Sequence, residues 1–221
     1  VLSKSEPAVS KVSHILPSYT VSAVSLPMKD TESYITAYQA YLDSKQALQS
    51  LRKKNRELQT RTGISPEDFV KRLDVKEMAR ATFMSGGDLD TVNLMRIGRQ
   101  DTLIFVGTQN KSFKNYVPAI HSWPYASFAA AIFGKFFQLK DESCFTYMDG
   151  WVITGSLKEV EEYVQGKTLE YDLVEYMADA GQKDMLGVDA SLVAYFSLTE
   201  NQEGHTNIFK KPFRNALKPL Y

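Results

Sequence analysis

Residues 144–166 constrain the fold most, because their order of residue types predicts two strands, a tight turn and a helix. Asp149–Gly150 can adopt the positive φ angles that a two-residue hairpin turn requires. Ser156 and Glu159 have the spacing of a capping box, in which the two residues satisfy free backbone amides at a helix start. Gly166 is placed to end that helix in a left-handed conformation. The segment therefore specifies architecture and contains no recognisable catalytic set.

A long helix is predicted over about 31–61, where apolar residues recur at the spacing of one helical face. Asp30 or Thr31 is placed to cap its start, and Gly63 to end it. Ser65–Asp68 then predicts a new helix, with serine as the cap and proline at the first helical position. The apolar stripe of the long helix consists of Tyr34, Ile35, Tyr38, Tyr41, Leu42, Leu48, Leu51 and Leu58.

Strand patterns occupy much of the remaining chain. Alternating or short apolar runs predict strands at 19–26, 78–84, 91–97, 102–106, 135–139, 144–148, 151–154 and 191–198. Helices are predicted at about 123–133, 157–165 and 170–180. This order predicts an α+β fold with antiparallel sheet or sheets, a long N-terminal helix, and several short helices packed on one face.

The chain divides into a lead-in and a domain. Residues 1–17 are polar and bounded by prolines, so we expect a loose lead-in segment. Residues 18–221 form one α+β domain, in which the likeness of the first and last strands suggests two similar subunits at about 18–110 and 111–200. The C-terminal tail then starts or completes another unit.

Composition argues against several classes of protein. Of the 221 residues, 43% are hydrophobic, which suits a packed globular protein. The 26 basic and 26 acidic residues cancel, so no overall field directs the protein to nucleic acid, and we expect no nucleic-acid partner. The single cysteine, Cys144, cannot form an intrachain disulfide or a CxxC metal or redox site.

No residue set predicts catalysis, metal binding or a cofactor. His14, His121 and His205 are scattered and have no partner at metal-ligand spacing. Ser156 lacks the flanking glycines of a nucleophile elbow, and its role as a helix cap explains it more simply. We therefore expect no catalytic residue, no metal and no cofactor.

Two clusters of charge are expected to be solvated faces, with polyanion binding and divalent-cation binding as the less favoured interpretations. The basic cluster consists of Arg52, Lys53, Lys54, Arg56 and Arg61. The acidic cluster consists of Glu159, Glu161, Glu162, Glu170, Asp172, Glu175 and Asp179.

Three aromatic residues are the candidate ligand-binding site. Tyr116, Trp123 and Tyr125 surround a loop-to-helix junction that Pro118 and Pro124 make rigid. Exposed aromatic rings on a rigid turn can stack on sugars or peptides. The competing interpretation is that these rings cover the core, and solvent exposure distinguishes the two.

A resemblance rests on two short segments. Residues 149–156 (Asp-Gly-Trp-Val-Ile-Thr-Gly-Ser), followed by a helix with Val160 and Val164, resemble a recurring unit in an uncharacterised bacterial family of membrane-anchored or lipoprotein-type envelope proteins. Thr62–Phe69 is similar to the segment that follows a long helix in that family. The resemblance spans about 20–200 and carries no catalytic residues to this chain. It implies an extracytoplasmic domain, in the periplasm or at the cell surface of a bacterium, from a longer anchored protein.

The sequence therefore predicts a non-enzymatic binding or scaffolding domain of the cell envelope, with an unknown protein or glycan as partner. Because the chain begins at Val1, we expect a processed or trimmed chain that meets the membrane only through an anchor outside it. Two alternatives stay open. One is a glycan- or peptide-binding module that uses surface aromatics, and the other is a hydrolase with an unrecognised carboxylate site.

Overall fold

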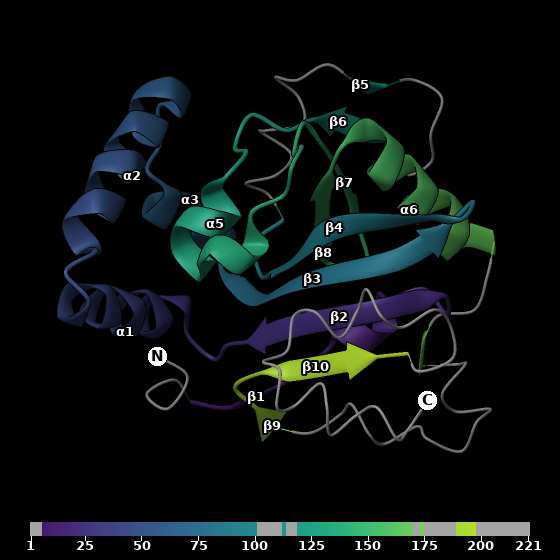
Figure 1. The fold of residues 1–221 in the computed structure, drawn as a ribbon, viewed down its shortest axis with the longest axis horizontal. Helices are drawn as coiled ribbons and strands as arrows, with labels where there is room; N and C mark the ends of the chain where they lie inside the picture. The colour runs from purple at the N-terminus through teal and green to yellow at the C-terminus, as the bar shows by residue number, and fades with distance from the viewer. Residues whose placement is uncertain (1–5, 101–111, 114–118, 170–172, 175–188, 198–221) are drawn as a thin grey trace.

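The computed structural model describes residues 6–100, 112–113, 119–169, 173–174 and 189–197. In these ranges an eight-stranded antiparallel sheet has the strand order β10–β2–β3–β4–β8–β7–β6–β5, while β1 and β9 pair separately (Figure 1). Helices and antiparallel strands are both present, so the predicted α+β class is confirmed. The sheet is continuous from one edge to the other across the described parts of both suggested subunits.

The strands of the large sheet are β2 (Thr20–Pro27), β3 (Val75–Ser85), β4 (Asp88–Ile97), β5 (Ser112–Phe113), β6 (Ile120–Ser122), β7 (Cys144–Met148), β8 (Trp151–Gly155) and β10 (Val193–Phe196). The separate pair is β1 (Ala8–Val9) and β9 (Asp189–Ala190). The α-helices are α1 (Thr31–Ser44), α2 (Leu48–Thr62), α3 (Pro66–Leu73), α5 (Phe128–Phe133) and α6 (Leu157–Leu169), and the 3-10 turns are η2 (Val12–His14) and η3 (Lys135–Phe137). The strand predicted at 102–106 lies outside the described residues, as does the helix predicted at 170–180 except for 173–174.

The prediction of one long helix over 31–61 is wrong, because the chain turns at 45–47 and forms α1 and α2 instead. Gln46 adopts a left-handed conformation with φ 56°, and the amide of Ala47 donates to the carbonyl of Leu42 at 2.9 Å. A straight helix over that span would be about 45 Å long. The turn allows α1 and α2 to contact α5 separately, which one straight helix does not permit.

One face of the sheet packs against α1, α3 and α5. Phe69 of α3 lies at the centre of this core, with the ring of Tyr125 4.2 Å away and that of Phe128 5.4 Å away. Tyr34 of α1 contacts Phe133 of α5, with 5.5 Å between the ring centroids. Burial of these aromatic surfaces supplies the main stabilisation of the helical layer.

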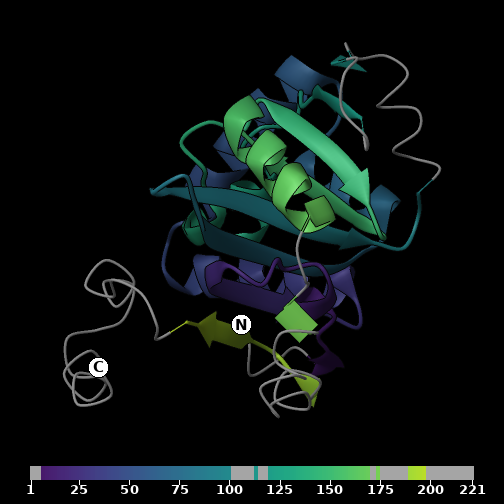
Figure 2. The same cartoon turned by 90° about the vertical axis from the view of Figure 1, so that its right-hand side faces the viewer.

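The opposite face is covered by α6 and by the N-terminal segment (Figure 2). Val12, Ile15 and Leu16 are buried there beside Tyr163 of α6. Helices therefore cover both faces of the sheet, and not one face as predicted. The described part of the lead-in is packed and not loose as predicted, because three apolar residues within this mostly polar segment are buried against the sheet.

Of the local predictions around the hairpin, the turn and the capping box are confirmed, and the helix end and a neighbouring strand are wrong. Asp149 (φ 51°) and Gly150 (φ 84°) form the predicted turn between β7 and β8. The capping box is also confirmed, since the amide of Glu159 donates to Ser156 Oγ at 3.3 Å and the amide of Ser156 to Glu159 Oε2 at 2.8 Å. Gly166 does not end the helix, which continues to Leu169. The predicted strand at 135–139 is instead the turn η3 and an extended link.

A close approach, not a helix end, explains the glycine at position 166. A Cβ built there would lie 1.5 Å from the hydroxyl oxygen of Tyr19 and 2.8 Å from a carbon of its ring. The Tyr19 ring packs edge-on against Phe83 at 5.8 Å, which limits how far it can move aside. The backbone of α6 therefore comes close to Tyr19 only because residue 166 has no side chain.

We expect Gly166→Ala to lower the free energy of unfolding by about 1 to 3 kcal/mol, the range of overpacking in a filled core. At an unobstructed helical position the same change stabilises by up to about 1 kcal/mol. Urea denaturation measures the difference. In a Tyr19→Ala background the obstruction is gone, so Gly166→Ala should then be neutral or stabilising; a loss of equal size in both backgrounds contradicts the proposed contact.

Candidate functional site

A groove between α2 and α5 is the candidate functional site. It has a volume of about 700 Å³, and α1, η3 and Gln138 complete its walls. The lining residues are Tyr38, Leu42, Ala47, Ser50, Leu51, Lys54, Glu57, Leu58, Arg61, Ser127, Ala130, Ala131, Lys135 and Gln138. Pockets of this size are typical of small-molecule and peptide sites.

The groove exists because α2 is sparsely packed. Only Leu48 and Asn55 of its fifteen residues are buried, and Asn55 Nδ2 is held by Glu67 Oε1 of α3 at 2.6 Å. Leu51 and Leu58 lie about one helical turn from these two residues, line the groove and are half-buried, and Leu58 also packs against the core. The helix is therefore fastened to α3 at Asn55, while the two leucines keep part of their surface open to the groove.

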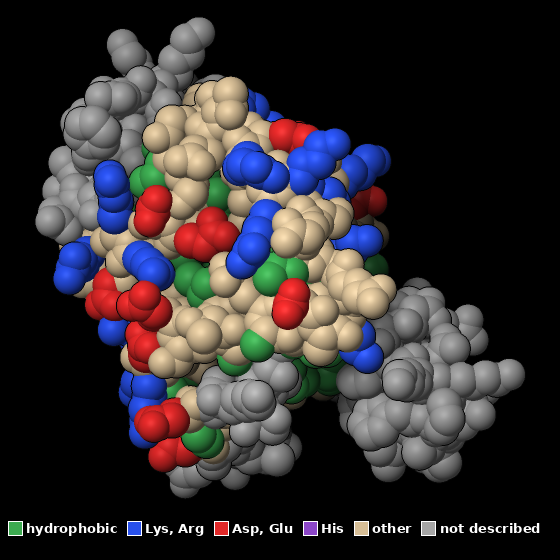
Figure 3. All heavy atoms as spheres, turned by 90° about the vertical axis from the view of Figure 1, so that its left-hand side faces the viewer, with side chains coloured by type: hydrophobic (Ala, Val, Ile, Leu, Met, Phe, Trp, Pro, Cys, Tyr) green, Lys and Arg blue, Asp and Glu red, His purple; other side chains and the backbone are tan. Residues whose placement is uncertain are grey.

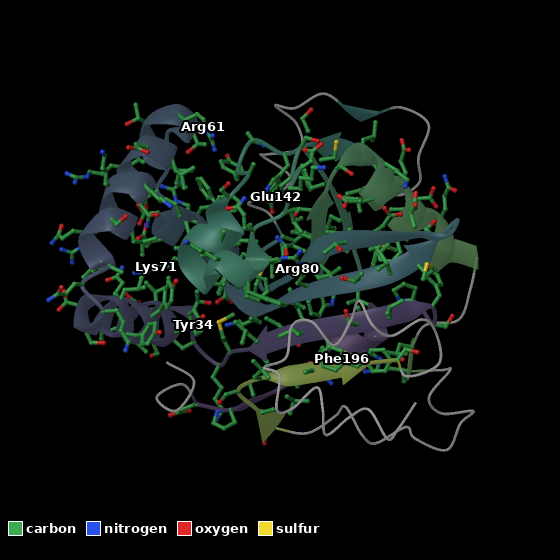
Figure 4. The ribbon with its side chains drawn as sticks, viewed as in Figure 1. Tyr34, Arg61, Lys71, Arg80, Glu142 and Phe196 are labelled. Atoms are coloured by element: carbon green, nitrogen blue, oxygen red, sulfur yellow. The ribbon has the colours of Figure 1, made fainter. Side chains whose placement is uncertain are left out.

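Basic side chains surround this apolar floor. Lys54 and Arg61 of α2 and Lys135 of η3 line the groove, against one acidic side chain among the described lining residues, Glu57. Arg61 Nη2 donates to the carbonyl of Ala126 at 3.2 Å, which fixes this guanidinium at one end of α2 (Figure 4). Lys and Arg side chains also gather on the face that α1 and α2 present in Figure 3. The groove therefore favours an anionic, partly apolar ligand.

The wall formed by α5 and η3 is held by a buried polar cluster on the sheet face. Glu142 Oε2 accepts the amide hydrogen of Ser127 at 2.8 Å, and its Oε1 accepts from Thr154 Oγ1 at 2.8 Å. Asn93 Nδ2 donates to the carbonyl of Phe137 at 2.8 Å. Arg80 binds the carbonyl of Phe136 as well. Glu142 (Figure 4) holds the N-cap residue of α5 and is not one of the residues that line the groove, so this carboxylate positions the groove wall.

Burial raises the pKa of the Glu142 carboxyl above its ordinary value of 4.5, although hydrogen bonds from Ser127, Thr154 and Asn93 partly offset the effect. The folded protein therefore holds this proton more tightly than the unfolded chain. As the pH falls from neutral towards 4.5, folding takes up a proton at Glu142 and its contribution to stability increases.

We expect the unfolding free energy of the wild type to rise, relative to Glu142→Gln, as the pH is lowered from neutral to 4.5. Urea denaturation of both proteins at a series of pH values measures the difference. Other titrating groups are common to both proteins and cancel. A difference that stays constant over this window contradicts a raised pKa for Glu142.

The three aromatic residues proposed from the sequence do not form one exposed cluster in the described part of the chain. Trp123 is 5% exposed and lies between Phe69 and Phe145, so its faces are not open to a ligand. Tyr125 is half-buried and stacks over Phe69. Tyr116 lies outside the described residues. The burial of Trp123 removes one stacking surface from the predicted aromatic site, and Tyr125 keeps a partly open one.

In the acidic cluster, Glu159, Glu161 and Glu162 are half-buried, and Glu159 and Glu162 accept hydrogen bonds from Ser156 and Ser85, while 170, 172, 175 and 179 lie outside the described residues. The basic cluster is divided between the groove and the open surface. Lys54 and Arg61 line the groove, whereas Arg52, Lys53 and Arg56 are exposed outside it. Among the described residues, no group of three or more His, Cys, Asp or Glu is placed to hold a metal ion.

The groove is not evident from the sequence, because its walls come from helices that are distant in the chain and its leucines belong to an apolar stripe that predicts core. One signal was present: the second half of the predicted long helix has few apolar residues, too few to bury a full face. Its cations at positions 54 and 61 are seven residues apart, and therefore share the face that carries Leu51 and Leu58.

Comparisons with protein-family models, with curated proteins and with solved structures found no match to this chain. Within the described ranges, none of the helices combines the length and the hydropathy that crossing a bilayer requires.

Proposed function

We propose that this protein is a non-enzymatic binding or scaffolding domain, and that it holds another macromolecule in the groove between α2 and α5. The observation that supports the proposal is the groove itself: a space of about 700 Å³ beside a sparsely packed helix, lined by Leu51 and Leu58 and bordered by three cations. A surface helix normally buries its apolar stripe. Leu51 and Leu58 are only half-buried, and both keep apolar surface that lines the groove.

The arrangement of carboxylates favours binding over hydrolysis. Glu77 and Glu142, the buried glutamates of the described core, are each occupied by several hydrogen-bond donors and do not line the groove. Glu57 is the one acid among the described groove-lining residues, whereas a hydrolase of the two-carboxylate type needs a second carboxyl beside the first. The groove composition suits recognition by charge and apolar contact.

A glycan- or peptide-binding role for surface aromatics is the weaker proposal, since it now depends on Tyr125 and on Tyr116. The envelope location, and attachment to a membrane through an anchor outside this chain, rest on the sequence resemblance and are proposed on that basis alone. A protein or glycan of the envelope is then the natural class of partner.

The proposal is tested by site-specific photo-crosslinking in the cells that make the protein. A photoreactive phenylalanine derivative replaces Ser50, which is exposed within the groove, or Arg56, which is exposed on the opposite side of α2. We expect a discrete adduct from position 50 that is absent from position 56, with its partner identified by mass spectrometry. In a Leu58→Glu background this adduct should disappear. The absence of a position-specific adduct contradicts the proposed binding function.

A further inference from the structure

We infer that the occupant of the groove is an amphipathic helix of a partner protein, with an apolar stripe flanked by acidic residues. This inference rests on the proposed binding function and names the kind of partner. It follows from three features of the described groove, namely its length, the size of the side chains in its walls, and the spacing of its charges.

The length of the groove matches a helix of about four turns. Its lining residues on α2 run from Ala47 to Arg61 along a single face, a span of about 21 Å. Leu51 and Leu58 lie seven residues apart on that face, two helical turns. A partner helix lying beside α2 presents its own apolar residues at intervals of three, four and seven, so that its stripe meets both leucines.

The opposite wall is built for close approach. Ala130 and Ala131 of α5 line it, and small side chains allow a neighbouring helix axis to come nearer than large ones do. Tyr38 and Leu42 of α1 close one end with largely apolar surface. α2 and α5 contact each other, so a partner helix lies over the groove and not between them. It then meets Leu51 and Leu58 on the α2 side and the two alanines on the α5 side.

The charges select an acidic helix. Lys54 and Arg61 are seven residues apart on α2, about 10 Å along its axis. Glutamates at the same interval on a parallel or antiparallel helix can pair with both, while Lys135 offers a further cation from the other wall. With Glu57 as the acid among the described lining residues, a basic helix would face more repulsion than attraction.

An acyl chain suits the groove less well. Polar side chains run beside the leucines along the whole groove, from Ser50 through Lys54 and Glu57 to Arg61. A lipid has one charged end, so most of these groups would lie against hydrocarbon without a partner, which is costly. A helix carries polar residues at every turn and can match them throughout.

The test uses three probes and the purified protein. The first is a fluorescent peptide of about 18 residues, with leucines at helical spacing and glutamates beside them. The second has lysine in place of each glutamate, and the third is laurate. Lys54→Glu with Lys135→Glu reverses the charge of both walls. Arg52→Glu with Arg56→Glu, outside the groove on the same face of α2 as each other, changes the net charge equally and serves as the control.

We expect the acidic peptide to bind, to gain helicity by circular dichroism, and to bind at least about tenfold more tightly than the basic peptide. Reversal of Lys54 and Lys135 should weaken the acidic peptide about tenfold and strengthen the basic one. The control should change either affinity by less than about threefold. Thermal melts of both variants check that the fold is retained.

Failure of the acidic peptide to bind, or equal affinity for the two peptides, overturns the helix inference. If laurate binds while the acidic peptide does not, the groove takes acyl chains; the helix inference falls and a binding function stands. If no probe binds and the photo-crosslinker at Ser50 also gives no specific adduct, both the inference and the proposed function fall.

Discussion

Replacement of Phe69 by alanine is expected to lower the free energy of unfolding by about 3 to 5 kcal/mol. Phe69 of α3 is 1% exposed, and the rings of Trp123, Tyr125 and Phe128 surround it at centroid distances of 5.7, 4.2 and 5.4 Å. The loss combines the transfer free energy of the ring with the cavity left between three large side chains that cannot all close in. Urea denaturation provides the measurement.

Phe136→Ala is the matched control for Phe69→Ala. Phe136 is 41% exposed, and its ring has the guanidinium carbon of Arg80 5.4 Å from its centroid. Loss of this exposed contact should cost about 1 kcal/mol or less. Similar midpoints for the two variants would show that Phe69 is not central to the helical layer, and that the assignment of Trp123 to the core beside it is mistaken.

Replacement of Glu77 by alanine is also expected to lower the free energy of unfolding by about 3 to 5 kcal/mol. Glu77 of β3 is fully buried, and its carboxylate accepts from Ser10 Oγ at 2.5 Å, Ser25 Oγ at 2.6 Å, the Lys11 amide at 2.9 Å and Arg96 Nε at 3.3 Å. Its removal leaves the Arg96 charge and three further donors without an acceptor, and buried donors left unpaired are costly. The N-terminal segment should lose its polar attachment to β3 at Ser10 and Lys11, while its buried apolar residues still cover the sheet.

Two measurements separate this role from a general effect on stability. Urea denaturation gives the loss of stability. In Glu77→Ala, hydrogen exchange at the Lys11 amide should accelerate, relative to the wild type, by a larger factor than exchange at the amides of β3. Glu32→Ala is the control, since Glu32 pairs with Lys71 at 2.7 Å in an exposed ion pair whose carboxylate side chain is 68% exposed. That pair should contribute about 1 kcal/mol or less. Unchanged exchange at Lys11 contradicts the proposed attachment.

The groove connects these effects to function. Phe69 lies on α3, and α3 fastens α2 through Glu67 and Asn55, so the core and the groove share a support. Glu142 holds the opposite wall through the amide of Ser127. A change at Lys54 or Lys135 alters the ligand site directly, whereas a change at Phe69 acts on it only through the fold. Binding and stability should therefore be separable by position.

The sequence by itself determined the elements whose cause is local. A capping side chain and its target amide lie within one turn of each other, so the caps Ser156 with Glu159 and Ser65 of α3 could be predicted from the sequence. At the start of α1 the sequence left Asp30 and Thr31 as alternatives, and Asp30 is the cap. The turn at Gly150 was equally evident, because positive φ angles at two successive residues are a property of the dipeptide itself.

The tertiary structure decided what depends on segments far apart in the chain. The turn at Gln46 has no glycine or proline to mark it, and it forms because α1 and α2 each contact α5. Gly166 is explained by Tyr19, 147 positions earlier, and the buried carboxylate of Glu77 by Ser10 and Arg96. The groove has the same origin. Its leucines and cations were visible as a helix face, but whether that face is covered or open depends on which helix lies opposite and how closely, and local residue pattern does not encode that distance.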